Sequence, residues 1–507
     1  MESNTTTRLK SIPHYLSKHW IFIVVLLVAA CVWYFVFLQA SLDFINGGHR
    51  PFRAVWNGYG HITLFGYTIN YSFEGYLDYD YYYYSWGQQF LKGIMPYTDA
   101  FNQSEINGTI YNTPYFFPPL FVYLCAIGSI LPIDPFGIGF LISLFGFLTA
   151  FPVYGISLYL SRNPHVASIA AGSYLFNPVV LYHTVFEWLN PAPFVFFMML
   201  SFYLLMKGKR TTGTLAMVTS AMFKQMAFFL ALPLIAYLLK RAPVENPVPL
   251  DAELRPAGDE LDLKGFAKII LVVIVFIVVI SFPYILDFNN YLYYIFQKPG
   301  GFLLNDITEY PNPSQPISFA VLFIALGAPA PVIQAINLAT YYSVFLVISI
   351  IPILTLMLLQ VKDDSDLRSY WGRILFLTLL LMLCVHLFSP RGIFKYYCVA
   401  LIPFFAIQPV SQMISVKNEK AKVSVFMILI PFALSFLILF PSRNIYLAFL
   451  LLTLVGYIAY NQFALVHGLF TDGILHLRKS QPHDDSDEVK SISDKSEKNE
   501  DYSIPSG

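Results

Sequence analysis

Apolar residues run through this chain in long blocks, which short polar, basic or proline-containing segments separate. A helix needs about 20 consecutive apolar residues to cross the hydrocarbon core of a bilayer, and many of the blocks approach that length. The blocks that predict membrane-spanning helices are 21–40, 136–160, 166–182, 191–206, 211–239, 267–286, 337–360, 374–389, 396–412, 423–440 and 445–466. With two short passes in 211–239, the pattern predicts an all-α, polytopic integral membrane protein with about twelve transmembrane helices.

The composition indicates the same class of protein. Of the 507 residues 56% are hydrophobic and 12% are charged, and the mean hydropathy is +0.58, too apolar for a soluble protein of this length. Basic and acidic residues each number 31, so no net field attracts nucleic acid, and no nucleic-acid partner is predicted. The four cysteines are scattered along the chain and indicate neither a disulfide framework nor a zinc site.

Basic residues indicate which loops face the cytoplasm, because lysine and arginine collect on that side of the membrane. The basic leader, residues 1–20, places the N-terminus inside, and the apolar block after it is interpreted as a retained anchor. Within a membrane domain of residues 21–470, the large loops 41–135 and 287–336 then lie outside. Residues 471–507 are rich in charged residues and serine, which predicts a disordered cytoplasmic tail.

The block 211–239 carries basic residues at both of its ends. The sequence "KGKR" (207–210) precedes it and Lys240 follows it. A single crossing would therefore put one basic cluster on the wrong side of the membrane. Two half-length passes that meet at Lys224 avoid this conflict and place Lys224 near the outer surface.

With this topology, the unusual polar residues beside apolar blocks all fall on the outer face. An ionisable residue at membrane depth is costly and marks a functional site by default. The residues concerned are Asp78, Asp80, Glu187, Lys224, His386, Arg391 and Lys395. The pattern predicts one site that faces outward.

Two acids stand inside the tyrosine-rich stretch "EGYLDYDYYYYSW" (74–86). Most D-x-D triplets are solvated loop tips, but tyrosines are interfacial residues and would hold Asp78 and Asp80 at headgroup depth. A strand-like or turn conformation would point both side chains to the same side. A partly buried carboxylate there can act as general base toward a sugar hydroxyl.

Several stretches resemble the membrane-embedded C-type (GT-C) glycosyltransferases. "DYDYYYYSWGQQFLKGIMPY" (78–97) and "YNTPYFFPPL" (111–120) are most similar to the first outer loop of the GPI mannosyltransferase I family and of bacterial and archaeal polyprenyl-phosphate-mannose mannosyltransferases. "LFNPVVLYHTVFEWLNPAPF" (175–194) and "FKQMAFFLALP" (223–233) are similar to the lipid-phosphate-glucose-dependent glucosyltransferases of N-glycan assembly. "HLFSPRGIFKYY" (386–397) has a weaker similarity to the same group.

The resemblance implies a GT-C-like fold and a hexosyltransferase whose donor is a sugar on a polyprenyl phosphate, such as dolichyl phosphate, in the lipid bilayer. It implies inverting transfer of a hexose, with mannose favoured, to a lipid-linked or protein glycan acceptor. One acid of the first loop serves as general base in such enzymes. We expect Asp80 to take this role and Asp78 to orient the acceptor, and the opposite assignment remains open. Because the leaving group is a monophosphate, no metal or other cofactor is expected.

The remaining candidates divide between the donor and the acceptor. The cations available for the donor phosphate are Lys224, Arg391 and Lys395. The candidates for acceptor binding or a structural role are His183, Glu187 and Gln225. Plainer alternatives exist for each group, because a lysine near a helix end can snorkel to the headgroups, basic residues are common at helix ends, and a polar pair can simply cap a loop.

A transporter or a flippase for lipid-linked saccharides is the rival class. Transporters tend to contain repeated halves with broken helices at corresponding positions, and here a single broken pair is predicted. A binding-only relative would have lost the acids. The site is expected on the extracellular side of the plasma membrane in a prokaryote, and on the lumenal side of the ER membrane in a eukaryote.

Overall fold

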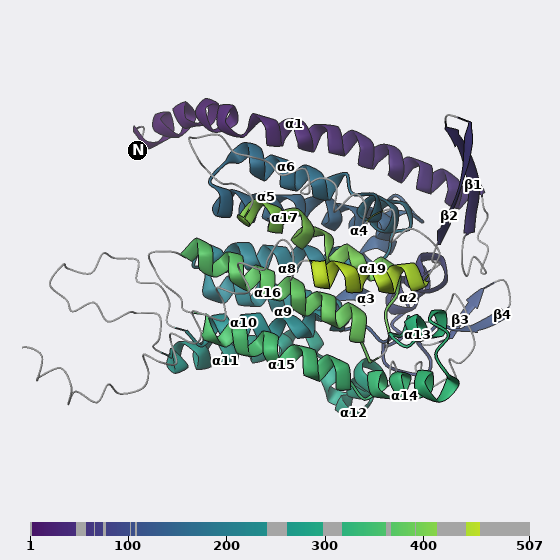
Figure 1. The fold of residues 1–507 in the computed structure, drawn as a ribbon. Coiled ribbons are helices and arrows are strands. Elements are labelled where there is room, and N and C mark those ends of the chain that lie inside the picture. Colours follow the sequence, from purple (N-terminus) through teal and green to yellow (C-terminus); the bar gives the residue numbers. More distant parts are fainter. Residues whose placement is uncertain are drawn as a thin grey trace, which may run out of the picture.

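The computed structural model describes residues 3–46, 57–64, 66–74, 78–101, 103–106, 109–240, 261–297, 317–360, 367–390, 392–412, 435 and 443–456. Helices dominate these residues, which confirms the predicted all-α membrane protein. Figure 1 shows the helices packed side by side, with α1 (Ser3–Asn46) running along one edge of the bundle from the N-terminal end to the opposite end.

The helices that follow α1, up to residue 240, contain most of the residues singled out in the sequence. Their bounds are η1 Tyr79–Tyr83, α2 Tyr84–Leu91, α3 Pro119–Ser129, α4 Gly137–Leu148, α5 Ala150–Ser161, α6 Pro164–Leu175, α7 Pro178–Val180, η2 Leu181–Phe186, α8 Pro191–Met206, α9 Arg210–Phe223, η3 Gln225–Leu230 and α10 Ala231–Leu238. η1 and η2 are π-helical and η3 is a 3₁₀ helix. Prolines stand in the first turn of α3, α6, α7 and α8, where the backbone N–H needs no intrahelical partner.

The second part of the chain supplies the rest of the bundle. Its helices are α11 Leu263–Ser281, η4 Tyr284–Asp287, α12 Phe288–Leu292, η5 Tyr293–Gln297, α13 Val321–Ala325, α14 Ala330–Tyr341, α15 Val344–Leu359, α16 Leu367–Phe388, η8 Lys395–Ala400, α17 Ile402–Gln412 and α19 Arg443–Gly456. The short elements η4 to α13 fall in the predicted outer loop 287–336 and beside it.

The first outer loop contains two antiparallel β-hairpins. The pattern of apolar blocks did not predict these hairpins. β1 (Asn57–Leu64) pairs with β2 (Tyr67–Glu74), and β3 (Gln103–Ile106) pairs with β4 (Thr109–Asn112). Figure 1 shows both hairpins at the end of the bundle where α1 finishes. They leave the helical character of the membrane domain unchanged.

Within the described residues, four helical stretches are each long and apolar enough to cross a membrane. They are Ser17–Ile45 of α1, the continuous α4 and α5, α11, and α16. α14 and α15, bent by 50° relative to each other, form a fifth candidate span. Since 423–434, 436–440 and 457–466 lie outside the described residues, the number of about twelve crossings stays a prediction.

The burial of the spans follows their place in the bundle. α16 is almost wholly buried and lies at the centre, whereas α1 and α11 expose most of their apolar side chains. An exposed helix that is apolar nearly all round is stable only when lipid surrounds it. The exposed faces of α1 and α11 therefore mark the boundary between the protein and the bilayer.

Candidate functional site

The predicted break at Lys224 is present, and it forms a helical hairpin. α9 ends at Phe223, Lys224 is extended (φ −154°, ψ 132°), and η3 begins at the next residue. At the other end of the hairpin, the Arg210 guanidinium donates hydrogen bonds to the carbonyl oxygens of Leu238 (2.6 Å) and Lys240 (3.3 Å). Both basic ends of the segment therefore lie together, which confirms the break at Lys224, and the two half-length membrane passes stay a prediction.

Lys224 is buried at the tip of this hairpin, with 3% of its surface exposed. Its ammonium group donates a hydrogen bond to Oδ1 of Asn190 and stands 3.4 Å from the ring centre of Tyr397. Rings of Phe194 and Tyr396 also lie within 6 Å of it. Aromatic faces stabilise a cation only in part, so a buried ammonium in such a setting is well placed to attract an anion. This is not the geometry of a lysine that reaches out to the headgroups.

Asp78 is connected to this lysine by a chain of hydrogen bonds. Its Oδ2 accepts hydrogen bonds from the hydroxyls of Tyr396 (2.9 Å) and, more weakly, Tyr83 (3.4 Å). The Tyr83 hydroxyl in turn accepts from the side-chain amide of Asn190 (2.6 Å), whose carbonyl oxygen binds Lys224. We call these five residues, Asp78, Tyr83, Asn190, Lys224 and Tyr396, the polar chain.

The polar chain joins residues from four distant parts of the sequence. Asn190 directly precedes α8, and Tyr396 is the second residue of η8. Burial, and then the charge of Asp78, raises the pKa of Tyr83 well above its usual value, so its hydroxyl stays protonated and can donate. A buried cation and a partly buried carboxylate are thereby held in one polar network.

The backbone around the two acids differs from the expected conformation. Asp78 precedes the π-helical η1, which contains Asp80, so the segment is helical rather than strand-like. Positions two apart in a helix do not share a face, and the argument that both acids point to the same side is therefore wrong. The side chain of Asp80 and the whole of Arg391 lie outside the described residues.

Aromatic packing explains why this tyrosine run forms a helix. The Tyr79 ring lies 4.7 Å from that of Trp188, and its hydroxyl donates to the carbonyl of Pro135 (2.5 Å). The Tyr83 ring packs edge-on against Phe121 of α3. Tyr79 and Tyr83, about one turn apart, are thus buried against the bundle, and this burial outweighs the strand propensity of tyrosine.

The other loop motifs build the platform that carries η1 and α2. Gly93, two residues after the end of α2, has φ +81°, a conformation that glycine adopts without strain. Tyr97 follows the turn, and its hydroxyl donates to the carbonyl of Phe117 (2.8 Å). The indole N–H of Trp86 donates to the carbonyl of Thr113 (2.9 Å). These contacts fold the loop back onto α3, which begins at Pro119 of the double proline.

A histidine and a glutamate form a buried pair beside the polar chain. Nδ1 of His183 lies 2.7 Å from Oε2 of Glu187, and the His183 ring lies 6.3 Å from that of Tyr396. Burial, and then the nearby Lys395, lowers the pKa of His183 to about 3. The histidine is therefore neutral at physiological pH and donates to the glutamate as an ordinary hydrogen bond.

A cavity of about 430 Å³ opens beside Lys224. Its lining includes Lys224, Gln225 and Tyr397, with apolar walls from η3, η5, α16 and the segment after α16. Gln225 does not point its amide at an open space, because Nε2 donates to the carbonyls of Phe116 and Ile295. Lys395 is buried near His183 and is not among the residues that line this cavity.

His386 of α16 lies behind the cavity wall. Its Nδ1 is 2.6 Å from the carbonyl oxygen of Met382 and its Nε2 is 3.1 Å from that of Tyr397. Both ring nitrogens therefore face backbone oxygens. His386 fixes the backbone at Tyr397, whose ring lies under the ammonium of Lys224.

Sequence reasoning did not single out Asn190, Tyr83 or Tyr396 as site residues. Asn190 stands before the proline that starts α8, where an asparagine is ordinary as a helix cap. Tyr396 adjoins Lys395, which drew attention by its charge alone. The sequence signal that could have identified Asn190 and Tyr396 is that each is a polar residue at the predicted outer end of an apolar block.

A comparison with protein families supports the glycosyltransferase class over the transporter class. Residues 162–298 match the model of the ALG6, ALG8 glycosyltransferase family. This match confirms the resemblance to membrane glycosyltransferases of the C type, and it does not single out the GPI mannosyltransferase I family. The matched segment contains Asn190, Lys224 and the His183–Glu187 pair. Among the curated proteins, no sequence matches the chain.

Proposed function

We propose that the protein transfers a hexose from a polyprenyl phosphate to a lipid-linked or protein glycan on the outer or lumenal side of the membrane. The observation that carries the proposal is the polar chain, in which a buried lysine beside an apolar-walled cavity is connected to a first-loop aspartate. Glycosyl transfer requires these two charges, a cation for the departing phosphate and a base for the acceptor hydroxyl.

Lys224 is proposed to bind the donor phosphate. The cavity beside it combines one ammonium group with walls of phenylalanine, isoleucine, methionine and valine. A sugar on a polyprenyl phosphate has the matching character, because a charged phosphate is attached to a long apolar chain. In the buried setting of Lys224, its charge stabilises the negative charge that grows on the phosphate as the bond to the sugar breaks.

The acids of the first loop are proposed to act on the acceptor. The carboxylate of one acid takes the proton of an acceptor hydroxyl while the oxygen of that hydroxyl forms a bond to the anomeric carbon. The bond from that carbon to the phosphate oxygen breaks, and polyprenyl phosphate leaves with the electron pair. Attack from the opposite side inverts the anomeric centre.

Asp80 is the proposed base, and Asp78 is proposed to position the acceptor. Oδ2 of Asp78 already accepts hydrogen bonds from Tyr396 and Tyr83, which fix its orientation and make that oxygen a poor acceptor for a further proton. A fixed carboxylate suits the binding of a second acceptor hydroxyl. Asp80 lies in the π-helical η1, and Asp78 directly precedes it.

The resemblances of the two regions favour different sugars. The first-loop motifs are most similar to mannosyltransferases, whereas the segment that the family model matches is similar to lipid-phosphate-glucose-dependent enzymes. Since Lys224 and Asn190 lie in the matched segment, we favour glucose for this chain and keep mannose as the alternative donor.

The test is to supply membranes containing the protein with radiolabelled polyprenyl-phosphate-glucose and polyprenyl-phosphate-mannose in parallel. Label should enter a glycan fraction from one of the two donors, and membranes without the protein are the control. Movement of intact labelled lipid across the bilayer, with no label in any glycan, would instead support the flippase.

A further inference from the structure

A second cavity, larger than the one beside Lys224, lies at the far end of the bundle. It has a volume of about 960 Å³ and opens between α1, α5, α8 and the first turn of α16. Asn190 precedes the 16-residue helix α8 and Lys207 follows it, so about 24 Å of helix separates Lys207, at one end of this cavity, from the polar chain. The cavity is thus distinct from the proposed donor site.

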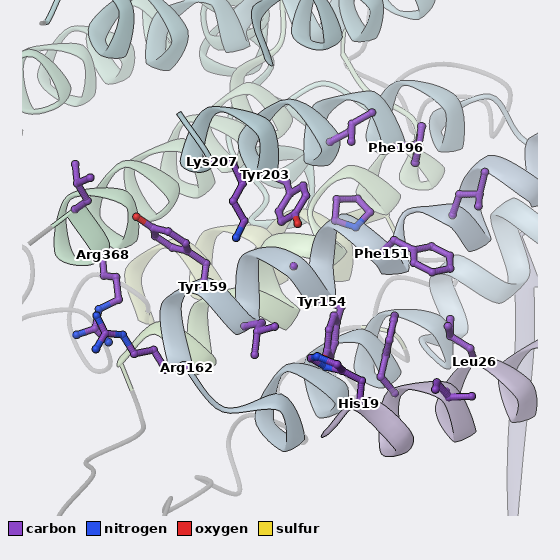
Figure 2. Close-up of a pocket in the computed structure, with 18 residues that line it drawn as sticks. His19, Leu26, Phe151, Tyr154, Tyr159, Arg162, Phe196, Tyr203, Lys207 and Arg368 are labelled. Carbon is purple, nitrogen blue, oxygen red and sulfur yellow. The ribbon is translucent and has the colours of Figure 1, made fainter. Parts of the chain in front are cut away.

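Three cations stand at one end of this second cavity. Arg162 and Lys207 directly follow α5 and α8, and Arg368 lies in the first turn of α16. Figure 2 shows Arg162 and Arg368 together at this end, with Lys207 pointing into the cavity. Within the part of the chain that the structure describes, no carboxylate lines the cavity and none of the three cations forms an ion pair.

The opposite end of the cavity is apolar and aromatic. Figure 2 shows Leu26, Phe151 and Phe196 there, away from Arg368. Phe22 of α1 stacks on Tyr154 with ring centres 3.9 Å apart, and this contact joins α1 to α5 at the cavity wall. The cavity therefore has a positive end and an apolar end.

We propose that this cavity binds one anionic phospholipid, whose phosphate lies against the three cations and whose acyl chain extends along the apolar end. Arg162, Lys207 and Arg368 lie at helix ends, where the bundle meets the headgroup region. Basic pockets between transmembrane helices on the cytoplasmic side match anionic headgroups, and the basic loops predict that this end faces the cytoplasm. α1, the helix that closes the cavity on one side, is otherwise largely exposed to lipid, so a bound lipid would add to its attachment.

The test uses purified, delipidated protein incubated with an equimolar mixture of phosphatidylglycerol and phosphatidylcholine, followed by native mass spectrometry. The variant R162Q/K207Q/R368Q removes the three cavity cations. The matched control, K209Q/K264Q/K268Q, removes three exposed lysines that do not line the cavity. Near an anionic lipid each cation contributes about fivefold in affinity, so the wild type should prefer phosphatidylglycerol by roughly 100-fold.

We expect the cavity variant to lose this preference and the control variant to keep it. The preference of the wild type should also weaken as salt is added, which gives a second readout that needs no variant. Equal retention of both lipids, displacement by millimolar inorganic phosphate, or an equal loss in the two triple variants would overturn the proposal. None of these readouts depends on sugar transfer.

Discussion

Replacing Lys224 with methionine removes the ammonium group and nearly keeps the volume of the side chain. If this group contacts the donor phosphate at about 4 Å, with an effective dielectric constant of about 20, the interaction contributes about 4 kcal/mol. That free energy corresponds to a loss of about 10³-fold in kcat/KM for the lipid donor. Inhibition by free polyprenyl phosphate should weaken in parallel, because the same contact holds the product.

The stability of Lys224→Met should change much less than its activity. The substitution leaves Oδ1 of Asn190 without its donor, a cost of about 1–3 kcal/mol, but it also removes a charge that burial disfavours. The two effects oppose each other, so the thermal midpoint should move little. A comparison of the wild type with Lys224→Met therefore measures the effect on donor binding separately from the effect on folding.

The assay measures kcat and KM for the lipid-linked donor in reconstituted membranes. Lys240→Met is the matched control, because Lys240 is also a buried lysine and stands at the other end of the same helical hairpin. The control should keep the wild-type donor KM. If Lys224→Met also keeps donor KM and kcat within about threefold, far below the effect calculated from the charge interaction, Lys224 does not bind the phosphate.

Three further predictions concern the surroundings of the site and its sidedness. Tyr396→Phe deletes the hydroxyl that fixes Asp78 and should lower kcat by about 10–100-fold with little change in donor KM, as measured by steady-state kinetics. The pKa of His183 is about 3 in the folded protein and near 6.5 in the unfolded chain. Between these pH values the unfolded state binds more protons than the folded state, so the free energy of unfolding falls as the pH drops from about 6.5 toward 3. Thermal unfolding scans should show this decline in the wild type and a flatter profile in His183→Gln. A cysteine introduced at position 105 should be labelled from outside, and one at position 490 should be labelled only after permeabilisation. The reverse pattern would contradict the predicted topology.

Several elements of the fold could be predicted because the physical signal is local. The bounds of α8 match the apolar block 191–206, which a proline opens and a glycine-containing basic sequence closes. The hairpin at Lys224 followed from the basic residues at both ends of one apolar block, and the contact between Arg210 and Leu238 bears it out. Charge at block ends is read directly from the sequence.

The polar chain could not be predicted, because its contacts join residues far apart in the sequence. Asp78 and Tyr396 are 318 positions apart, and nothing near either residue indicates the other. A strand-like or turn conformation is the expectation for the two acids, whereas the burial of Tyr79 against Trp188 favours the helix η1. Tertiary packing decided the local conformation there.

The central claim is that the acids of the first loop act as base and positioning group in a site shared with Lys224. The most direct measurement is single-turnover transfer of radiolabelled hexose from polyprenyl phosphate by reconstituted Asp80→Asn and Asp78→Asn proteins, with donor binding measured separately. Asp80→Asn should bind the donor normally and transfer its sugar about 10²–10⁴-fold more slowly, because the amide cannot take the acceptor proton. Asp78→Asn should show a smaller loss. Transfer above about a tenth of the wild-type rate in both variants would contradict the account, because a general base contributes far more than that.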